Sequence, residues 1–225
     1  MATEIAGDTA SIRAVLFDLD GTFADTAPDM ARALNVIRFK HGLPALPLAN
    51  IRPHVSRGAR GMLDVGFGIS PQQEEFAILR DAFYDEYQRN ICVESALFDG
   101  METLIGILEQ RNIVWGIVTN KAARFALPIA QVLGFAERAA CIVCGDTTAH
   151  TKPHPAPLLH AAQLIGIAPN DTLYVGDDQR DIQAAHSAGM FAVAATYGYI
   201  SADIDPHGWG ADYTISTPTG LIPLL

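Results

Sequence analysis

Two carboxylates, Asp18 and Asp20, directly follow the apolar run Val15-Leu16-Phe17 and precede Gly21 and Thr22. A short apolar run of this kind is typical of a buried strand. Residues two apart in extended backbone point to the same side, where two like charges resist joint ionisation. A bound divalent cation is the simplest compensation, and Mg²⁺ is favoured because it prefers oxygen ligands. The alternative interpretation is a strand that ends in an acidic turn without further function.

Two later apolar runs also end in polar side chains. Thr119 and Asn120 follow the run at 114–118, and Asp177 and Asp178 follow the run at 172–175 and one glycine. In parallel α/β sheets, ligands bind beyond the carboxyl ends of the strands. We therefore expect these three polar clusters to meet at one edge of a sheet.

The elements that would position these clusters alternate along the chain. Strands are expected at about 13–18, 114–118, 140–144, 172–175 and 190–194, and helices at about 101–110, 122–133, 156–166 and 179–188. This rhythm predicts an α/β fold with a Rossmann-like, doubly wound parallel sheet and right-handed crossovers.

The segment between the first two clusters has a different pattern. Residues 24–93 show helical spacing and no convincing strand, including a capping-type helix start at Ser70-Pro71-Gln72-Gln73-Glu74. We therefore expect a helical domain at 24–93, inserted into a core domain formed by 1–23 and 94–225.

Composition limits the classes of partner. The 225 residues carry a formal net charge of −10, and 49% of them are hydrophobic, which is enough for a sizeable core. The charge argues against nucleic acids and anionic membranes as partners and leaves a small molecule as the expected one. No apolar run approaches the roughly 20 residues of a membrane span. The polar residues 1–11 lack a leader pattern, so a cytoplasmic protein is expected. The oligomeric state is not predictable.

The three cysteines do not suggest a disulfide framework. Cys141 and Cys144 have CxxC spacing, but they lie in an apolar run that is expected to be a strand. Residues three apart in a strand face opposite sides, and no second cysteine pair completes a zinc site.

Four motifs together resemble those of the haloacid dehalogenase-like hydrolases. Asp18-Leu19-Asp20-Gly21-Thr22 resembles the first motif of that family, Val118-Thr119-Asn120 the second, and Lys152 the third. The run Gly176-Asp177-Asp178-Gln179-Arg180-Asp181 resembles the fourth, an acidic loop that completes a metal site. The resemblance covers essentially the whole chain and includes a helical C1 cap at the position of the inserted segment.

The resemblance implies a role for each matching residue. Asp18 would be the nucleophile that forms an aspartyl-phosphate, and Asp20 the general acid and base. Lys152 would supply positive charge. Mg²⁺ would be held by the Asp18 carboxylate, the Asp20 backbone carbonyl and the Asp177 carboxylate.

Other roles stay open at this point. Thr119 and Asn120 are expected to bind phosphoryl oxygens, although Thr119 could simply cap a helix. Asp178 or Asp181 would support the metal, or Asp181 would instead hold Lys152, and the sequence does not rank these options.

The substrate is expected to be a small carboxylate-bearing phosphate ester. Dehalogenases and phosphonatases of the family lack an acid at the position of Asp20, which favours phosphate ester hydrolysis. Ser56 and Arg57, in the expected cap, could bind a carboxylate, or they could form a solvated helix start. Three stretches are similar to the phosphoglycolate phosphatase branch and to its bacterial members that act on N-acetylmuramic acid 6-phosphate. They are Val55-Ser56-Arg57-Gly58-Ala59-Arg60, Trp115-Gly116-Ile117-Val118-Thr119-Asn120-Lys121 and Tyr197-Gly198-Tyr199-Ile200. A phosphosugar mutase and a non-catalytic phosphometabolite-binding protein are the alternatives.

Overall fold

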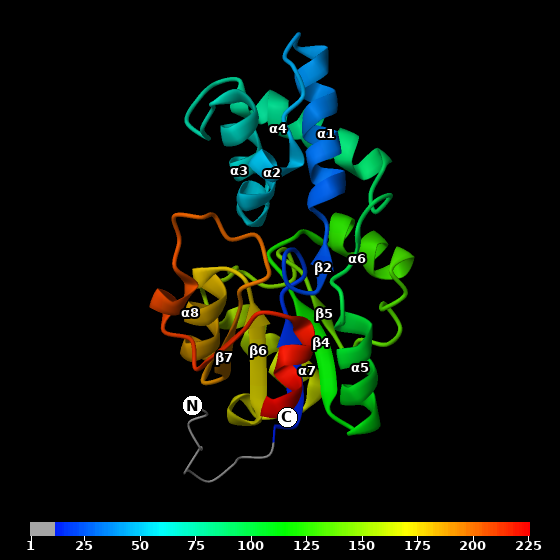
Figure 1. Ribbon diagram of the computed structural model, residues 1–225, viewed down its shortest axis with the longest axis vertical. Coiled ribbons are helices and arrows are strands. Elements are labelled where there is room, and N and C mark those ends of the chain that lie inside the picture. The colour runs from blue at the N-terminus through cyan, green and yellow to red at the C-terminus, as the bar shows by residue number, and fades with distance from the viewer. Residues whose placement is uncertain (1–11) are drawn as a thin grey trace.

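A six-stranded sheet, parallel throughout, forms the centre of the molecule (Figure 1). This computed structural model describes residues 12–225, so the lead-in expected at residues 1–11 lies outside the described residues. The strand order is β5-β4-β1-β6-β7-β8. The strands are β1 (Ala14–Phe17), β4 (Val114–Val118), β5 (Ile142–Val143), β6 (Thr172–Gly176), β7 (Phe191–Ala195) and β8 (Tyr213–Ile215).

Helices cover both faces of the sheet because successive residues of the buried strands face opposite sides. Val15 and Phe17 pack in one core with α5 (Met101–Gln110) and α6 (Ala123–Val132). Leu16 packs in another core with α7 (Ala156–Ile165) and α8 (Gln179–Ala188). The predicted α/β, Rossmann-like fold is confirmed, and the four helix positions match closely.

The chain between β1 and β4 forms a group of helices around a hydrophobic core that Phe125 and Ile129 of α6 and Tyr199 also join. This helical segment contains α1 (Ala27–Lys40), α2 (Leu48–Ile51), a 3-10 turn (Arg52–Arg57), α3 (Gly58–Phe67) and α4 (Phe76–Arg89). Leu34, Met62 and Phe83 are fully buried among its helices. The segment lies beyond the carboxyl ends of the strands, at the top of Figure 1.

Two short strands tie the helical segment to the rest of the chain. β2 (Ala24–Asp25) pairs antiparallel with β3 (Ala96–Leu97). The expectation that residues 24–93 contain only helices was therefore wrong at Ala24 and Asp25. β2 was missed because two residues are too few to show a periodicity.

A second correction concerns the start of α4. At Ser70 the capping contact forms, since Gln73 accepts hydrogen bonds from the Ser70 backbone N–H and hydroxyl, but it closes only a local turn and the helix does not start there. The helix begins at Phe76.

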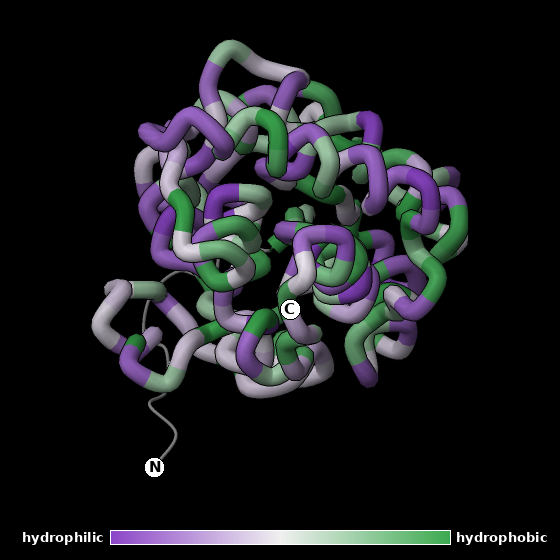
Figure 2. Tube along the Cα trace, turned by 90° about the horizontal axis from the view of Figure 1, so that it is seen from above, coloured by the Kyte–Doolittle hydropathy of each residue, from purple (hydrophilic) through white to green (hydrophobic). Residues whose placement is uncertain are grey.

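The remaining ordered structure is short. The 3-10 helices Pro169–Asp171, Pro206–Trp209 and Pro218–Leu224 complete the described chain. Hydrophilic and hydrophobic residues alternate along the coils of the tube in Figure 2, as in amphipathic elements that pack on a core. Among residues 12–225, none of the helices combines the length and the apolar character that a membrane crossing needs.

Candidate active site

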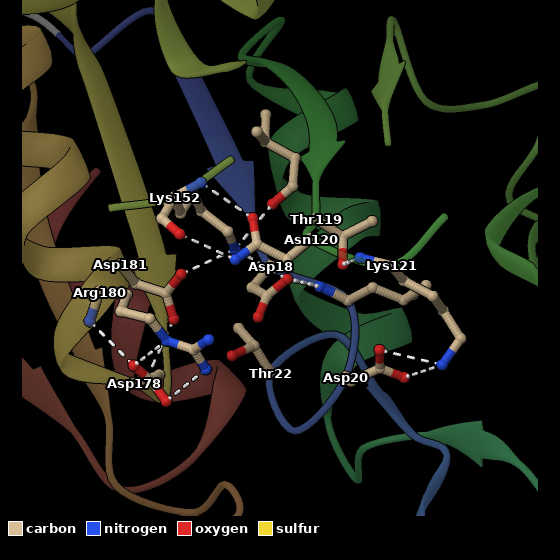
Figure 3. Close-up of polar contacts among 12 residues, drawn as sticks. Asp18, Asp20, Thr22, Thr119, Asn120, Lys121, Lys152, Asp178, Arg180 and Asp181 are labelled. Carbon is tan, nitrogen blue, oxygen red and sulfur yellow. Dashed lines mark hydrogen bonds and ion pairs between the residues drawn. The ribbon is translucent and has the colours of Figure 1, made fainter. Parts of the chain in front are cut away.

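Three carboxylates meet at the carboxyl ends of the central strands. Figure 3 shows two of them, Asp18 and Asp181, with Lys152 between them. Asp18 follows β1, Asp177 follows the neighbouring β6, and Asp181 comes from the first turn of α8. One oxygen of each lies within 4.8 Å of the others. Asp18 and Asp177 were expected at one edge of the sheet, and they lie close together there. The sequence analysis left the role of Asp181 open.

A single ammonium group lies among these carboxylates. Lys152 Nζ is 2.9 Å from Asp18 Oδ1 and 2.7 Å from Asp181 Oδ1, and its side chain is 2% exposed. Burial, together with the nearby Asp18 and Asp181, raises the pKa of Asp177 well above its usual range. Burial also raises the pKa of Asp181, to about 6, although Lys152 opposes this shift.

The donor set fits a hard divalent cation. All three side chains offer carboxylate oxygens, which Mg²⁺ prefers. One Lys152 charge does not balance three carboxylates, and a cation with two positive charges would restore neutrality. The cluster is therefore able to hold a metal ion, as the sequence predicted for this edge of the sheet.

Asp177 is held in place by its neighbours. Its Oδ2 accepts a hydrogen bond from the Tyr199 backbone N–H at 2.8 Å, and its Oδ1 accepts one from the Thr22 hydroxyl at 3.2 Å. The backbone of Gly21 packs directly against this carboxylate: a Cβ there would lie 2.1 Å from Asp177 Oδ2. Only glycine fits at position 21, where φ is also +85°.

Asp20 is separated from this cluster and has its own cation. Lys121 Nζ lies 2.8 and 3.0 Å from the two Asp20 oxygens, and the Thr26 hydroxyl also donates to Asp20. Burial alone would lower the pKa of Lys121, but the Asp20 carboxylate outweighs it and raises that pKa. The sequence analysis gave Lys121 no role, although it directly follows a predicted strand-end motif.

Thr119 and Asn120 differ in what they contact. Thr119 is buried, lines the cavity described below, and accepts a hydrogen bond from the Lys121 backbone N–H at 3.2 Å. The Asn120 amide instead binds the Lys152 backbone twice, donating to its carbonyl at 3.0 Å and accepting from its N–H at 2.9 Å. This arrangement fixes the loop that carries Lys152.

Asp178 is not part of the carboxylate cluster and instead caps α8. Its side chain accepts hydrogen bonds from the Arg180 backbone and, at 2.8 Å, from the Arg180 guanidinium. Arg180 also donates to the Ser56 carbonyl at 2.8 Å, and the Ser56 hydroxyl lies 3.4 Å from Asp177 Oδ2. Ser56 thus joins the helical segment to the acidic loop.

A cavity of about 400 Å³ lies between the helical segment and the sheet. Asp18, Asp20, Lys152 and Thr119 line its side toward the sheet, and Arg57 lines it from the helical segment. Arg57 is also paired with Asp64 at 3.3 Å. All the predicted site residues except Asp177 therefore line one cavity that a small molecule can fill.

Comparison with known proteins identifies the family of this chain. Residues 15–195 match the family model for haloacid dehalogenase-like hydrolases, and the chain belongs to this family. The predicted family and the predicted phosphatase class of hydrolase are confirmed.

The most informative relatives are bacterial phosphatases. The chain is 44% identical to an N-acetylmuramic acid 6-phosphate phosphatase of Pseudomonas aeruginosa, over 95% of both chains. It is 47% identical to a phosphoglycolate phosphatase of Xanthomonas campestris, over 93% of this chain and 94% of the relative. A crystal structure described as a predicted phosphoglycolate phosphatase from Haemophilus somnus superposes with a TM-score of 0.84 at 27% identity, covering 97% of this chain and 99% of that one.

Proposed function

We propose that this chain is a Mg²⁺-dependent, cytoplasmic phosphomonoesterase for a small carboxylate-bearing phosphate ester. The observation that carries the proposal is that two neighbouring carboxylates are each paired with a different lysine. Asp18 is held by Lys152 and Asp20 by Lys121, so two acids on one short stretch have different surroundings. Different surroundings allow one acid to act as nucleophile and the other to transfer protons.

The reaction proceeds in two displacements. An Asp18 oxygen attacks phosphorus and forms the aspartyl-phosphate, while the bond from phosphorus to the substrate alcohol breaks. Asp20 gives its proton to the leaving alkoxide. A water molecule then attacks the phosphorus and returns a proton to Asp20, releasing phosphate and restoring the Asp18 carboxylate. Lys152 and Thr119 bind the phosphoryl oxygens during both steps.

The metal site would be formed by Asp18, Asp177 and Asp181, with the Asp20 backbone carbonyl as a further ligand by family resemblance. When bound, Mg²⁺ supplies positive charge for the phosphoryl group and the nucleophile. Without the metal, the Lys152 ammonium supplies one positive charge at this place, and it keeps Asp18 in position.

The helical segment, expected as a cap over residues 24–93, serves as a lid that excludes water from the phosphoryl group. Its helices share one hydrophobic core, which Phe125 and Ile129 of α6 also join, so opening the lid would separate these two α6 residues from it. The contact from Arg180 to the Ser56 carbonyl supports a coupling between lid position and the acidic loop. Ser56 and Arg57 would face the substrate from this lid.

A phosphatase assay with and without Mg²⁺ tests the proposal, first with p-nitrophenyl phosphate and then with 2-phosphoglycolate and N-acetylmuramic acid 6-phosphate. Release of inorganic phosphate that depends on Mg²⁺ is expected. A product that keeps its phosphate would instead indicate a phosphosugar mutase, and binding without turnover under any metal would indicate a phosphometabolite-binding protein.

A further inference from the structure

One residue in the loop after β7 contacts both the carboxylate cluster and the base of the helical segment. Tyr199 follows the last strand but one of the sheet, yet its side chain is 4% exposed and packs in the hydrophobic core of the helical segment. The loop that carries it rises from the sheet toward these helices, in orange in Figure 1. The two displacement steps do not use this side chain, so its position has another cause.

The backbone of this loop packs directly against Asp177. The Tyr199 N–H donates to Asp177 Oδ2 at 2.8 Å. A Cβ on the preceding Gly198 would lie 2.3 Å from the Asp177 Cβ and 2.4 Å from the Gly21 carbonyl oxygen, so only glycine allows this close approach. A shift of Tyr199 would therefore shift the N–H that orients the Asp177 carboxylate.

The hydroxyl of Tyr199 caps the start of α1. The side chain of Thr26, the N-cap residue of α1, donates to Asp20 and does not cap its own helix. The Tyr199 hydroxyl instead accepts hydrogen bonds from the backbone N–H groups of Thr26 at 2.6 Å and Ala27 at 3.0 Å. Buried N–H groups at the start of a helix need such an acceptor. The Ala27 N–H also reaches Asp25 Oδ1 at 3.3 Å, so the Thr26 N–H depends more on the phenol.

The hydroxyl proton extends this connection to β2. Tyr199 Oη donates to Asp25 Oδ1 at 2.8 Å, and Asp25 Oδ2 pairs with Arg52 at 2.9 Å. Arg52 begins the 3-10 turn that carries Ser56, and its guanidinium carbon lies 5.5 Å from the centre of the Tyr199 ring. Burial and the Asp25 charge raise the pKa of Tyr199 well above its usual range, so the hydroxyl keeps the proton that it donates to Asp25.

We propose that Tyr199 is a positioning residue that couples the position of the lid to the orientation of Asp177. Asp25 and Thr26 lie where the chain passes from the sheet into the helical segment, so movement of the lid at this point would move the phenol. The same residue carries the N–H that holds Asp177. A coupling of this kind is reciprocal: the lid position that favours Mg²⁺ binding is itself favoured by bound Mg²⁺. The inference rests on the proposed metal site and lid and names the residue that connects them.

The test removes the hydroxyl of Tyr199 and keeps the ring. Tyr199→Phe is compared with Thr172→Val, which also deletes a buried hydroxyl. Thr172 begins β6, the strand that Asp177 follows, and its hydroxyl donates to the Ala168 carbonyl at 3.0 Å, at the end of the strand away from the cluster. Mg²⁺ binding is measured by calorimetry well below the thermal midpoint of each variant. Amide hydrogen exchange of the peptide that contains Thr26 and Ala27 is followed with and without Mg²⁺, so neither measurement requires turnover.

Tyr199→Phe is expected to raise the Mg²⁺ dissociation constant by about fivefold, and Thr172→Val by less than about twofold. In the wild type, saturating Mg²⁺ should slow amide exchange at Thr26 and Ala27 by roughly fivefold. In Tyr199→Phe, exchange at these amides should be fast both with and without the metal.

An unchanged Mg²⁺ dissociation constant in Tyr199→Phe would overturn the inference, even in a less stable variant, because a merely structural tyrosine has that signature. Equal weakening of Mg²⁺ binding in Thr172→Val would also overturn it, as would wild-type exchange that does not respond to Mg²⁺. If the expected pattern occurs in a protein that hydrolyses no phosphate ester, the coupling is supported and the phosphatase proposal alone is refuted.

Discussion

Lys121 Nζ contacts both oxygens of the Asp20 carboxylate, at 2.8 and 3.0 Å, while 5.0 Å separates it from the centre of the Tyr87 ring. The lysine follows a strand of the sheet and Tyr87 belongs to α4 of the helical segment. The side chain that orients the proposed proton donor is therefore packed against the proposed lid. The proposed lid and the proposed proton donor therefore both lie against this one ammonium group.

Lys121→Met should impair proton transfer more than phosphoryl binding. Without its cation, Asp20 loses the contact that orients it, and an unactivated alkyl ester depends most on protonation of the leaving group. We expect kcat to fall by roughly a hundredfold for an alkyl phosphate and much less for p-nitrophenyl phosphate, whose leaving group is a weak base. Steady-state kinetics on both esters checks this. Equal losses on the two would show that Lys121 does not act through Asp20.

Asp18→Asn should abolish turnover without unfolding the protein. The amide is a poor nucleophile, while the substitution removes one of three crowded negative charges. The thermal midpoint of the metal-free variant should equal or exceed that of the wild type, as measured by circular dichroism. Residual turnover above a few per cent would exclude Asp18 as the nucleophile.

Mg²⁺ should raise the thermal midpoint of the wild type, because an ion that binds only the folded state stabilises it. Asp181→Asn and Asp177→Asn should each reduce this shift, and Asp178→Asn, which alters the partner of Arg180, should leave most of it. Differential scanning fluorimetry across a Mg²⁺ titration measures the shifts. A full shift in Asp181→Asn would restrict the ligands to the set predicted from the sequence.

Asp29 makes the stability of the helical segment depend on pH. Its Oδ2 accepts hydrogen bonds from three successive backbone N–H groups at 93–95 and from the Ser95 hydroxyl. Burial alone would raise the pKa of Asp29, but these bonds and Arg32 outweigh it and lower the pKa below 3.8. A lowered folded-state pKa gives stability that is present above the unfolded pKa and is lost as pH falls through the folded value.

Asp29→Asn should therefore destabilise the protein by about 2 kcal/mol at pH 7, with the difference from wild type shrinking below pH 3.8. Urea unfolding at several pH values provides the measurement. Asp81→Asn, whose carboxylate is exposed, serves as the control and should change little. A difference that is constant over the whole pH range would mean that the Asp29 charge does not contribute.

The sequence predicted those parts of the structure that depend on local pattern. Buried strands that end in polar residues placed Asp18, Thr119 and Asp177 at one sheet edge, and the alternating helices followed the expected positions closely. β8 was not expected, because this edge strand spans only Tyr213–Ile215 and has no long apolar run.

The contacts between distant elements could not be predicted in the same way. Asp181 belongs to the carboxylate cluster because the first turn of α8 approaches Lys152, a loop residue 29 positions earlier. Arg124 and Tyr84 meet only when α6 packs against α4. Hydrophobic periodicity in a single sequence does not indicate which side chains of distant elements touch. For this reason the sequence analysis gave Lys121 and Arg124 no role.

The chain leaves the core and returns to it at adjacent points, because Ala24 lies opposite Leu97 and Asp25 opposite Ala96. The intervening helices are thus attached to the core domain by two adjacent chain segments, the paired strands β2 and β3. The six-stranded sheet contains no strand from these helices, so their sequence can diverge without breaking the backbone hydrogen bonds of the sheet. Selection can therefore alter which alcohol is accepted while the phosphoryl chemistry stays unchanged.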